Sequence, residues 1–116
     1  MADDKTIFEK IRDGEIPAEI VHEDEHCLCF RDISPQAPTH LLLVPKRRVA
    51  RLTAAGQADG ELLGHLMLAS ATVAREQGFA ESGYRVVINN GPDGGEEVPH
   101  LHLHLLAGRR LEWPPG

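Results

Sequence analysis

Three histidines alternate with leucines near the end of the chain: His100, His102 and His104. Because successive side chains of a β-strand point to opposite faces, this spacing predicts a strand over residues 100–106 with the three imidazoles on one face. Imidazole titrates near neutral pH, so this face could transfer protons, bind a metal ion or attack phosphorus.

Three interpretations of this run compete. The first is a set of core or surface histidines, but three adjacent rings would each need hydrogen-bond partners and would repel one another when protonated. The second is a metal site; the outer two rings lie about 13 Å apart along a strand, so only a neighbouring pair with a remote ligand could share an ion. The third is catalysis, with His102 as the nucleophile in phosphoryl or nucleotidyl transfer.

A glycine-rich loop directly precedes the histidines. It reads Asn-Asn-Gly-Pro-Asp-Gly-Gly-Glu-Glu over residues 89–97. Glycines permit a backbone in which consecutive N–H groups point into one hollow and bind phosphate oxygens, although the same residues also form ordinary turns. The loop and the histidines together favour phosphate chemistry.

These motifs resemble the histidine triad (HIT) family, in particular its HINT-type nucleoside phosphoramidases. Residues 100–106 fit the pattern His-φ-His-φ-His-φ-φ, where φ is apolar, and residues 30–40 and the ending Trp-Pro-Pro-Gly at 113–116 fit that branch. The resemblance covers about residues 5–116. It implies a single HIT domain over 1–116, with residues 1–4 disordered and residues 109–116 reaching toward a partner subunit. It also implies an α+β fold with one long and one short helix, whose five antiparallel strands form a ten-stranded sheet across a homodimer.

The resemblance also implies an activity. We expect a purine nucleoside 5′-phosphoramidate hydrolase that forms a nucleotidyl intermediate on His102, with His104 on the phosphate oxygens. His100 and His40 are expected to form a buried hydrogen-bonded set that orients His102, and no metal or other cofactor is required. The alternatives are a dinucleoside polyphosphate hydrolase or nucleotidyl transferase, and a nucleotide-binding adaptor with minor turnover.

The same resemblance assigns nucleotide contacts. Asp32 is expected to hold the ribose hydroxyls, and Trp113 to shape specificity at the partner subunit's site. The other expected contacts are Asn89, Gly95, Glu97, Val98, Phe8, Ile11, Ile16, Phe30, Arg31 and Ile33. Taken singly, the apolar residues are also typical of a core, Asp32 of a turn cap and His40 of a core histidine.

Some positions depart from the branch pattern. Many members carry Gln and Ser or Thr where this chain has Glu96 and Glu97, and two carboxylates near a phosphate would repel it. Either these side chains turn to solvent or the leaving-group preference has changed. Pro99 and Ala107 also differ from the common residues.

Composition excludes several classes. The formal net charge of −6 over 116 residues gives no support for nucleic-acid binding. The acidic N-terminus does not resemble a secretory signal and no apolar run is long enough to span a membrane, so we expect a cytoplasmic protein. Cys27 and Cys29 are expected to be buried strand thiols, although His26 and the two cysteines could also be imagined as a metal clip.

Periodicity then places the elements. A short helix is predicted over residues 5–13, ending near Gly14, and strands over 19–22, 26–31, 39–44 and 84–89. A long helix is predicted over 59–77, capped by Asp59 and ended by Gly78. Its core stripe is expected to comprise Leu62, Leu63, Leu66, Met67, Ser70, Val73 and Ala74.

Overall fold

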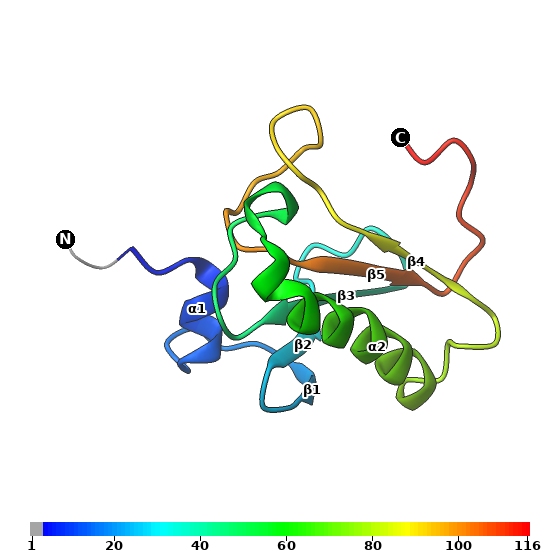
Figure 1. Ribbon diagram of the computed structural model, residues 1–116. Coiled ribbons are helices and arrows are strands. Elements are labelled where there is room, and N and C mark those ends of the chain that lie inside the picture. Colours follow the sequence, from blue (N-terminus) through cyan, green and yellow to red (C-terminus); the bar gives the residue numbers. More distant parts are fainter. Residues whose placement is uncertain (1–3) are drawn as a thin grey trace.

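The computed structural model describes residues 4–116 and has the predicted α+β architecture (Figure 1). Five antiparallel strands form one sheet in the order β1-β2-β3-β5-β4. The elements are α1 (Ile7–Arg12), β1 (Ile20–Glu23), β2 (Cys27–Arg31), β3 (Thr39–Pro45), 3-10 turns at Leu52–Ala54 and Gln57–Asp59, α2 (Gly60–Glu76), β4 (Tyr84–Val87) and β5 (Leu103–Ala107). Disorder was predicted for residues 1–4, and residues 1–3 of this range lie outside the described residues.

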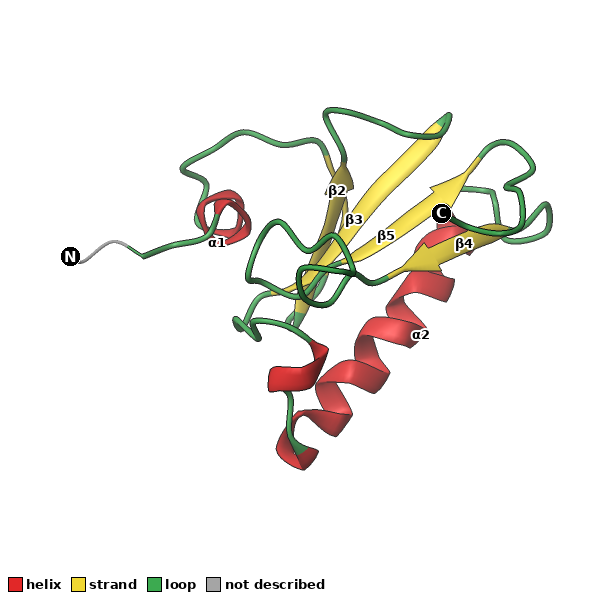
Figure 2. Cartoon of the chain, turned by 90° about the horizontal axis from the view of Figure 1, so that it is seen from above, coloured by secondary structure: helices red, strands yellow, loops and turns green. Residues whose placement is uncertain are grey.

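The sheet separates two apolar cores, and Figure 2 shows α2 on one side and α1 on the other. Alternation along β3 explains the division. Leu41 and Leu43 pack with α2, whereas Leu42 and Val44 pack with Phe8 of α1. The sheet face opposite α2 is therefore only partly covered, by a helix at one end.

Helix α1 begins at a capping box. The hydroxyl of Thr6 accepts a hydrogen bond from the backbone N–H of Glu9, and the Glu9 carboxylate accepts one from the N–H of Thr6. Gly14 follows the helix with φ of 78°, a conformation that favours glycine. The short helix is confirmed, and its N-terminus is held by side chains.

Helix α2 is confirmed, with two corrections. Met67 is 52% exposed and lies outside the core stripe. Asp59 precedes the helix but does not cap it, because its carboxylate accepts the N–H of Gly56 and closes the preceding 3-10 turn. Gly78, with φ of 85°, ends the helix as predicted. Within residues 4–116, no helix is both long and apolar enough to cross a membrane.

The predicted strand over 100–106 is wrong at its start, because β5 begins only at Leu103. Two prolines give the physical reason. Pro99 has no N–H to donate, and β3 ends at Pro45, so the β3–β5 ladder ends at the pair Leu43–Leu103. Residues 98–100 instead form a bend in which the N–H of His100 donates to the carbonyl of Val98 (2.8 Å).

The hairpin of β1 and β2 carries the two cysteines. Both thiols are free and fully buried, as predicted, on the sheet face covered by α2. His26 is exposed at the hairpin turn.

Candidate active site

His40 and His104 lie on neighbouring strands and share a hydrogen bond. In the β3–β5 register His40 is opposite Leu106 and His104 is opposite Leu42, so the two histidines are diagonal neighbours on one face. His40 Nε2 lies 2.9 Å from His104 Nδ1. The alternation of Leu103, His104 and Leu105 matches the predicted separation of leucines and histidines.

A chain of hydrogen bonds determines the tautomer of both rings. The backbone N–H of Gln36 can only donate, and it donates to Nδ1 of His40 (3.0 Å). In neutral His40 the proton is therefore on Nε2, which donates to Nδ1 of His104. In neutral His104 the remaining proton is on Nε2, so that nitrogen is a hydrogen-bond donor.

His100 is buried between two partners from distant parts of the chain. Its Nε2 lies 2.9 Å from the carbonyl oxygen of Pro45, which can only accept, so Nε2 carries the proton. Its Nδ1 then accepts from the hydroxyl of Thr6 at 2.8 Å. The N-cap of α1 and the first histidine of the run thus share one hydroxyl.

His102 is oriented by the backbone of His100. Its Nδ1 lies 2.8 Å from the His100 carbonyl oxygen, so Nδ1 carries the proton and Nε2 has the lone pair. Among the described residues, none hydrogen-bonds to Nε2. The ring contacts Phe8 edge-on, with centroids 4.8 Å apart, and lies 5.0 Å from the ring of His104.

The expectation that His40 and His100 form one hydrogen-bonded set is wrong. The two rings share no hydrogen bond: His40 pairs with His104, and His100 acts on His102 through its carbonyl oxygen. The reason is that His100 lies before β5, where its ring turns toward Pro45 and α1.

Burial keeps three of these rings neutral. Burial lowers the pKa of His104 to about 4, with further lowering from His102 and His40. The pKa values of His40 and His100 are also lowered, in both cases chiefly by burial. At neutral pH the cluster therefore avoids the mutual repulsion that three imidazolium ions would cause.

The loop over residues 89–97 contains turns at 91–95, which is one of the two arrangements that its glycines allow. The N–H groups of Gly94 and Glu96 donate to the carbonyl of Gly91, and that of Gly95 donates to Pro92. A Cβ on Gly94 would lie 2.5 Å from the carbonyl oxygen of Asn90, so the turn requires glycine there. In the described chain, the N–H groups of Glu97 and Val98 are left without a protein acceptor.

Glu96 is neutralised by Arg51. The guanidinium donates twice to the carboxylate, from Nε and Nη2, at 2.8 Å each, and the N–H of Gly91 donates to Oε1 at 2.8 Å. Arg51 and this N–H lower the pKa of Glu96 to about 2. Glu97 is exposed. Of the two carboxylates that depart from the family pattern, one is therefore paired and the other faces solvent.

Asp32 sits beside the histidines and also caps its own turn. Its Oδ1 accepts from the N–H of Ser34 (2.7 Å), and its Oδ2 lies 3.5 Å from Nε2 of His40. Ligand atoms of Asp32, His40 and His104 lie within 4.8 Å of one another. A metal ion there would displace the hydrogen bond between the two rings, which makes this cluster a poor fit for a cation.

The other predicted nucleotide contacts are divided between core and surface. Phe8, Ile11 and Phe30 are buried together with Leu28, and Ile16 and Val98 pack at the edge of that core. Ile33 is 95% exposed, Asn89 is half-buried, and Arg31 is exposed and pairs with Glu19 at 2.8 Å. Trp113 is 81% exposed and makes no ring contact or hydrogen bond with the histidines among residues 4–116.

Sequence reasoning missed four residues that hold this site: Thr6, Gln36, Pro45 and Arg51. Gln36 and Pro45 act through backbone atoms, which leave no sequence signal. Thr6 had one, since Thr followed three residues later by Glu marks a capping box, but its link to His100 is long-range. Arg51 and Glu96 are 45 positions apart.

Comparison with known proteins identifies the family. The HIT domain family matches residues 13–111. An uncharacterized HIT-like protein of Synechococcus elongatus is 56% identical over 111 residues, covering 96% of each chain. A 14 kDa zinc-binding protein of Zea mays is 51% identical over 116 residues, covering 98% of this chain and 90% of its own.

Solved structures of HIT proteins have the same fold as this chain. A HIT family hydrolase from Legionella pneumophila superimposes with a TM-score of 0.93 at 49% identity, covering 97% of this chain and 100% of that one. A histidine triad nucleotide-binding protein from Candida albicans superimposes with a TM-score of 0.80 at 30% identity, covering 95% of this chain and 83% of that one. The chain belongs to the HIT family.

Proposed function

We propose that the protein hydrolyses purine nucleoside 5′-phosphoramidates through a nucleotidyl intermediate on His102. The observation that carries this proposal is the orientation of the His102 ring. Its Nδ1–H donates to the carbonyl oxygen of His100 at 2.8 Å, which leaves the lone pair of Nε2 available to attack phosphorus. The family includes proteins described as hydrolases and as nucleotide-binding.

In the first step, Nε2 of His102 bonds to the α-phosphorus, the P–N bond breaks, and the leaving nitrogen takes a proton from solvent water, so that it departs as the amine. The ring becomes positively charged, because Nε2 is now bonded to phosphorus while Nδ1 keeps its proton. The His100 carbonyl stabilises that charge because it already accepts the Nδ1–H. Water then releases the nucleoside monophosphate and regenerates the neutral ring.

His104 supplies a hydrogen-bond donor to the phosphoryl oxygens. Its tautomer places the proton on Nε2, and its pKa of about 4 keeps the ring neutral at pH 7. We therefore assign it the role of a neutral donor, in place of the cationic imidazole that the charge of the substrate would otherwise favour. The N–H groups of Glu97 and Val98 are available for the same oxygens.

The loop charge is compatible with an anionic substrate. Glu96 would repel phosphate if it were unpaired, but Arg51 neutralises it. The exposed Glu97 can point to solvent while its backbone N–H donates. No metal or other cofactor has a task in this scheme.

We also propose a homodimer. Strand β4 is one of the two edge strands of the sheet, the other being β1, and its outer backbone groups can pair with β4 of a second copy to form the ten-stranded sheet. The exposed Trp113 is then available to the partner's site, where it would shape the choice of amine.

The proposal is tested by comparing substrates. Adenosine 5′-phosphoramidates are expected to show a kcat/KM at least about tenfold above that of diadenosine polyphosphates, a difference of about 1.4 kcal/mol in transition-state binding. A preference for the polyphosphate would replace the proposal by the dinucleoside polyphosphate hydrolase. Tight binding of nucleoside monophosphate without turnover of either substrate would favour the adaptor.

A further inference from the structure

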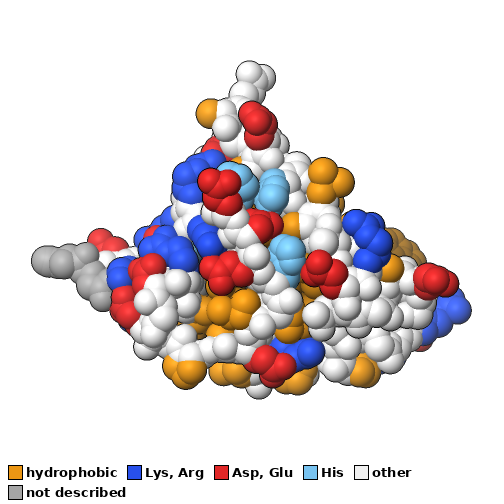
Figure 3. Space-filling view, turned by 90° about the horizontal axis from the view of Figure 1, so that it is seen from below, with side chains coloured by type: hydrophobic (Ala, Val, Ile, Leu, Met, Phe, Trp, Pro, Cys, Tyr) orange, Lys and Arg blue, Asp and Glu red, His pale blue; other side chains and the backbone are white. Residues whose placement is uncertain are grey.

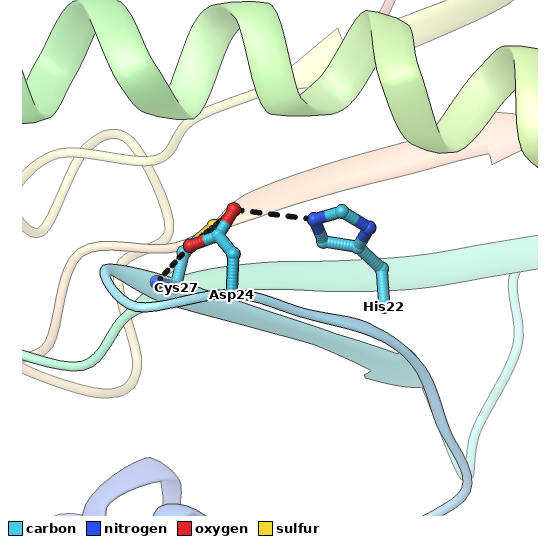
Figure 4. A group of neighbouring side chains, drawn as sticks. All are labelled: His22, Asp24 and Cys27. Atoms are coloured by element: carbon cyan, nitrogen blue, oxygen red, sulfur yellow. Dashed lines mark hydrogen bonds and ion pairs between the residues drawn. The ribbon is translucent and has the colours of Figure 1, made fainter.

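A second group of potential ligands lies on the other face of the molecule, against α2. His22 is at the end of β1, Asp24 is in the hairpin turn and Cys27 begins β2. Figure 4 shows the three side chains converging beneath α2. Figure 3 shows that histidine, acidic and basic side chains gather on this face. None of these residues takes part in the proposed catalysis.

We propose that His22, Asp24 and Cys27 bind one Zn²⁺ ion, with His65 of α2 as the candidate fourth ligand. The donor set is one imidazole nitrogen, one carboxylate oxygen and one sulfur, the three donor types that zinc accepts in proteins. The three ligand atoms all lie within 4.8 Å of one another.

The distances fit a tetrahedral ion. His22 Nε2 lies 3.3 Å from Asp24 Oδ2, and Cys27 Sγ lies 3.4 Å from both Asp24 oxygens. A tetrahedral ion with bonds of about 2.0–2.3 Å separates its ligands by about 3.3–3.8 Å. His65 Nε2 is 2.9 Å from Asp24 Oδ2, so this half-exposed ring contacts the carboxylate of the group from α2.

The ligand histidine has a suitable second partner. His22 Nδ1 lies 3.3 Å from the carboxylate of Glu76 on α2, so Glu76 can accept the Nδ1–H while Nε2 faces the ion. Carboxylates commonly hold metal-binding histidines in this way. Asp24 is itself fixed, because its Oδ1 accepts the N–H groups of His26 and Cys27 at 2.8 and 3.0 Å.

The charges also balance. Binding would release the proton of the Cys27 thiol, and the thiolate with the Asp24 carboxylate would then neutralise the dication. A cleft of about 550 Å³ borders His65, the candidate fourth ligand, and its lining includes Glu25 and Glu61 together with Lys46 and Arg47.

The ion would tie the β1–β2 hairpin to α2. Both His65 and Glu76 belong to that helix, whereas the three proposed ligands belong to the hairpin. Its role is therefore structural, and it is distinct from the cluster of Asp32, His40 and His104 in the candidate active site.

Cobalt titration of the reduced full-length protein tests the site, with Co²⁺ as the spectroscopic stand-in for Zn²⁺. We expect one ion per chain, displaced by Zn²⁺, with a sulfur-to-cobalt charge-transfer band. Cys27→Ser should abolish the band. Cys29→Ser is the matched control, because Cys29 is a second buried free thiol two residues along the same strand, and it should keep the band.

Variants that leave both thiols in place cover the case in which Cys27→Ser does not fold. His22→Gln and Asp24→Asn should each weaken binding at least about tenfold, and Glu76→Gln by about 10–100-fold. His104→Gln, at the other cluster, should leave the affinity unchanged. The proposal is overturned if Co²⁺ does not bind, if it binds without a sulfur band, or if His104→Gln alone removes it.

Discussion

The backbone N–H of Gln36 determines which nitrogen of His104 is protonated, although these two residues are joined only through His40. Gln36 donates to Nδ1 of His40, and Nε2 of His40 pairs with Nδ1 of His104 at 2.9 Å. The protonated Nε2 of His104 is thereby left as a donor for substrate. The loop before β3 thus sets the chemistry of a residue on β5.

His40 is accordingly a positioning residue. His40→Leu should lower kcat by about 10–100-fold, because it removes the donor to His104 Nδ1 and frees the His104 tautomer. His40→Gln, whose amide N–H can still donate, should recover part of the rate. The ¹⁵N chemical shifts of His104 measure the tautomer directly. A normal rate and an unchanged His104 tautomer in His40→Leu would show that the relay has no effect.

Thr6 connects α1 to the histidines. Thr6→Val should lower the free energy of unfolding by about 1–3 kcal/mol, because it removes the helix cap and leaves Nδ1 of the buried His100 without a donor. Urea denaturation measures the change. Thr6→Ser keeps the hydroxyl and serves as the control. If Val and Ser are equally tolerated, the hydroxyl does not hold the two elements together.

Arg51 and Glu96 should behave as one unit. Arg51→Gln leaves an unpaired carboxylate in the phosphate loop and should raise KM for an anionic substrate several-fold. The double variant Arg51→Gln/Glu96→Gln removes that charge and should return KM toward the parent value. A double-mutant cycle on KM measures the coupling between the two positions. Additive effects of the two changes would contradict this account.

The histidine cluster should make stability depend on pH. The folded-state pKa values of His40, His100 and His104 are lowered, to about 4 for His104, whereas the unfolded value is about 6.5. Between about pH 6.5 and 4 the unfolded chain binds more protons, so the free energy of unfolding falls as the pH is lowered through that window. Urea unfolding at pH 7 and pH 5 measures this, and His104→Gln should reduce the dependence. A parent protein equally stable at both values would contradict the prediction.

The sequence was sufficient for the fold class because the patterns that specify it are local. Alternation of Leu103, His104 and Leu105 placed the histidine and the leucines on opposite faces, and helix periodicity placed α2. The start of β5 was not predicted, because it depends on where β3 ends at Pro45. Met67 was assigned to the core from periodicity alone, but its side chain is half-exposed.

The sequence predicted which residues form the site better than it predicted the hydrogen bonds between them. The histidines were identified from their spacing and from the family resemblance. Their hydrogen bonds were not, because they run to backbone atoms of Gln36 and Pro45 and to a hydroxyl 94 positions away. From the sequence, the charge of Glu96 was expected to repel phosphate, but in the structure Arg51 pairs with this carboxylate.

The most direct test of the central claim is rapid quench of the parent protein with an adenosine 5′-phosphoramidate, followed by mass spectrometry of the digested chain. We predict a transient nucleotidyl adduct on the peptide that contains His102, formed at least as fast as steady-state turnover. His102→Gly should form no adduct and should lose turnover. An adduct on another residue, or undiminished P–N cleavage by His102→Gly, would contradict the account.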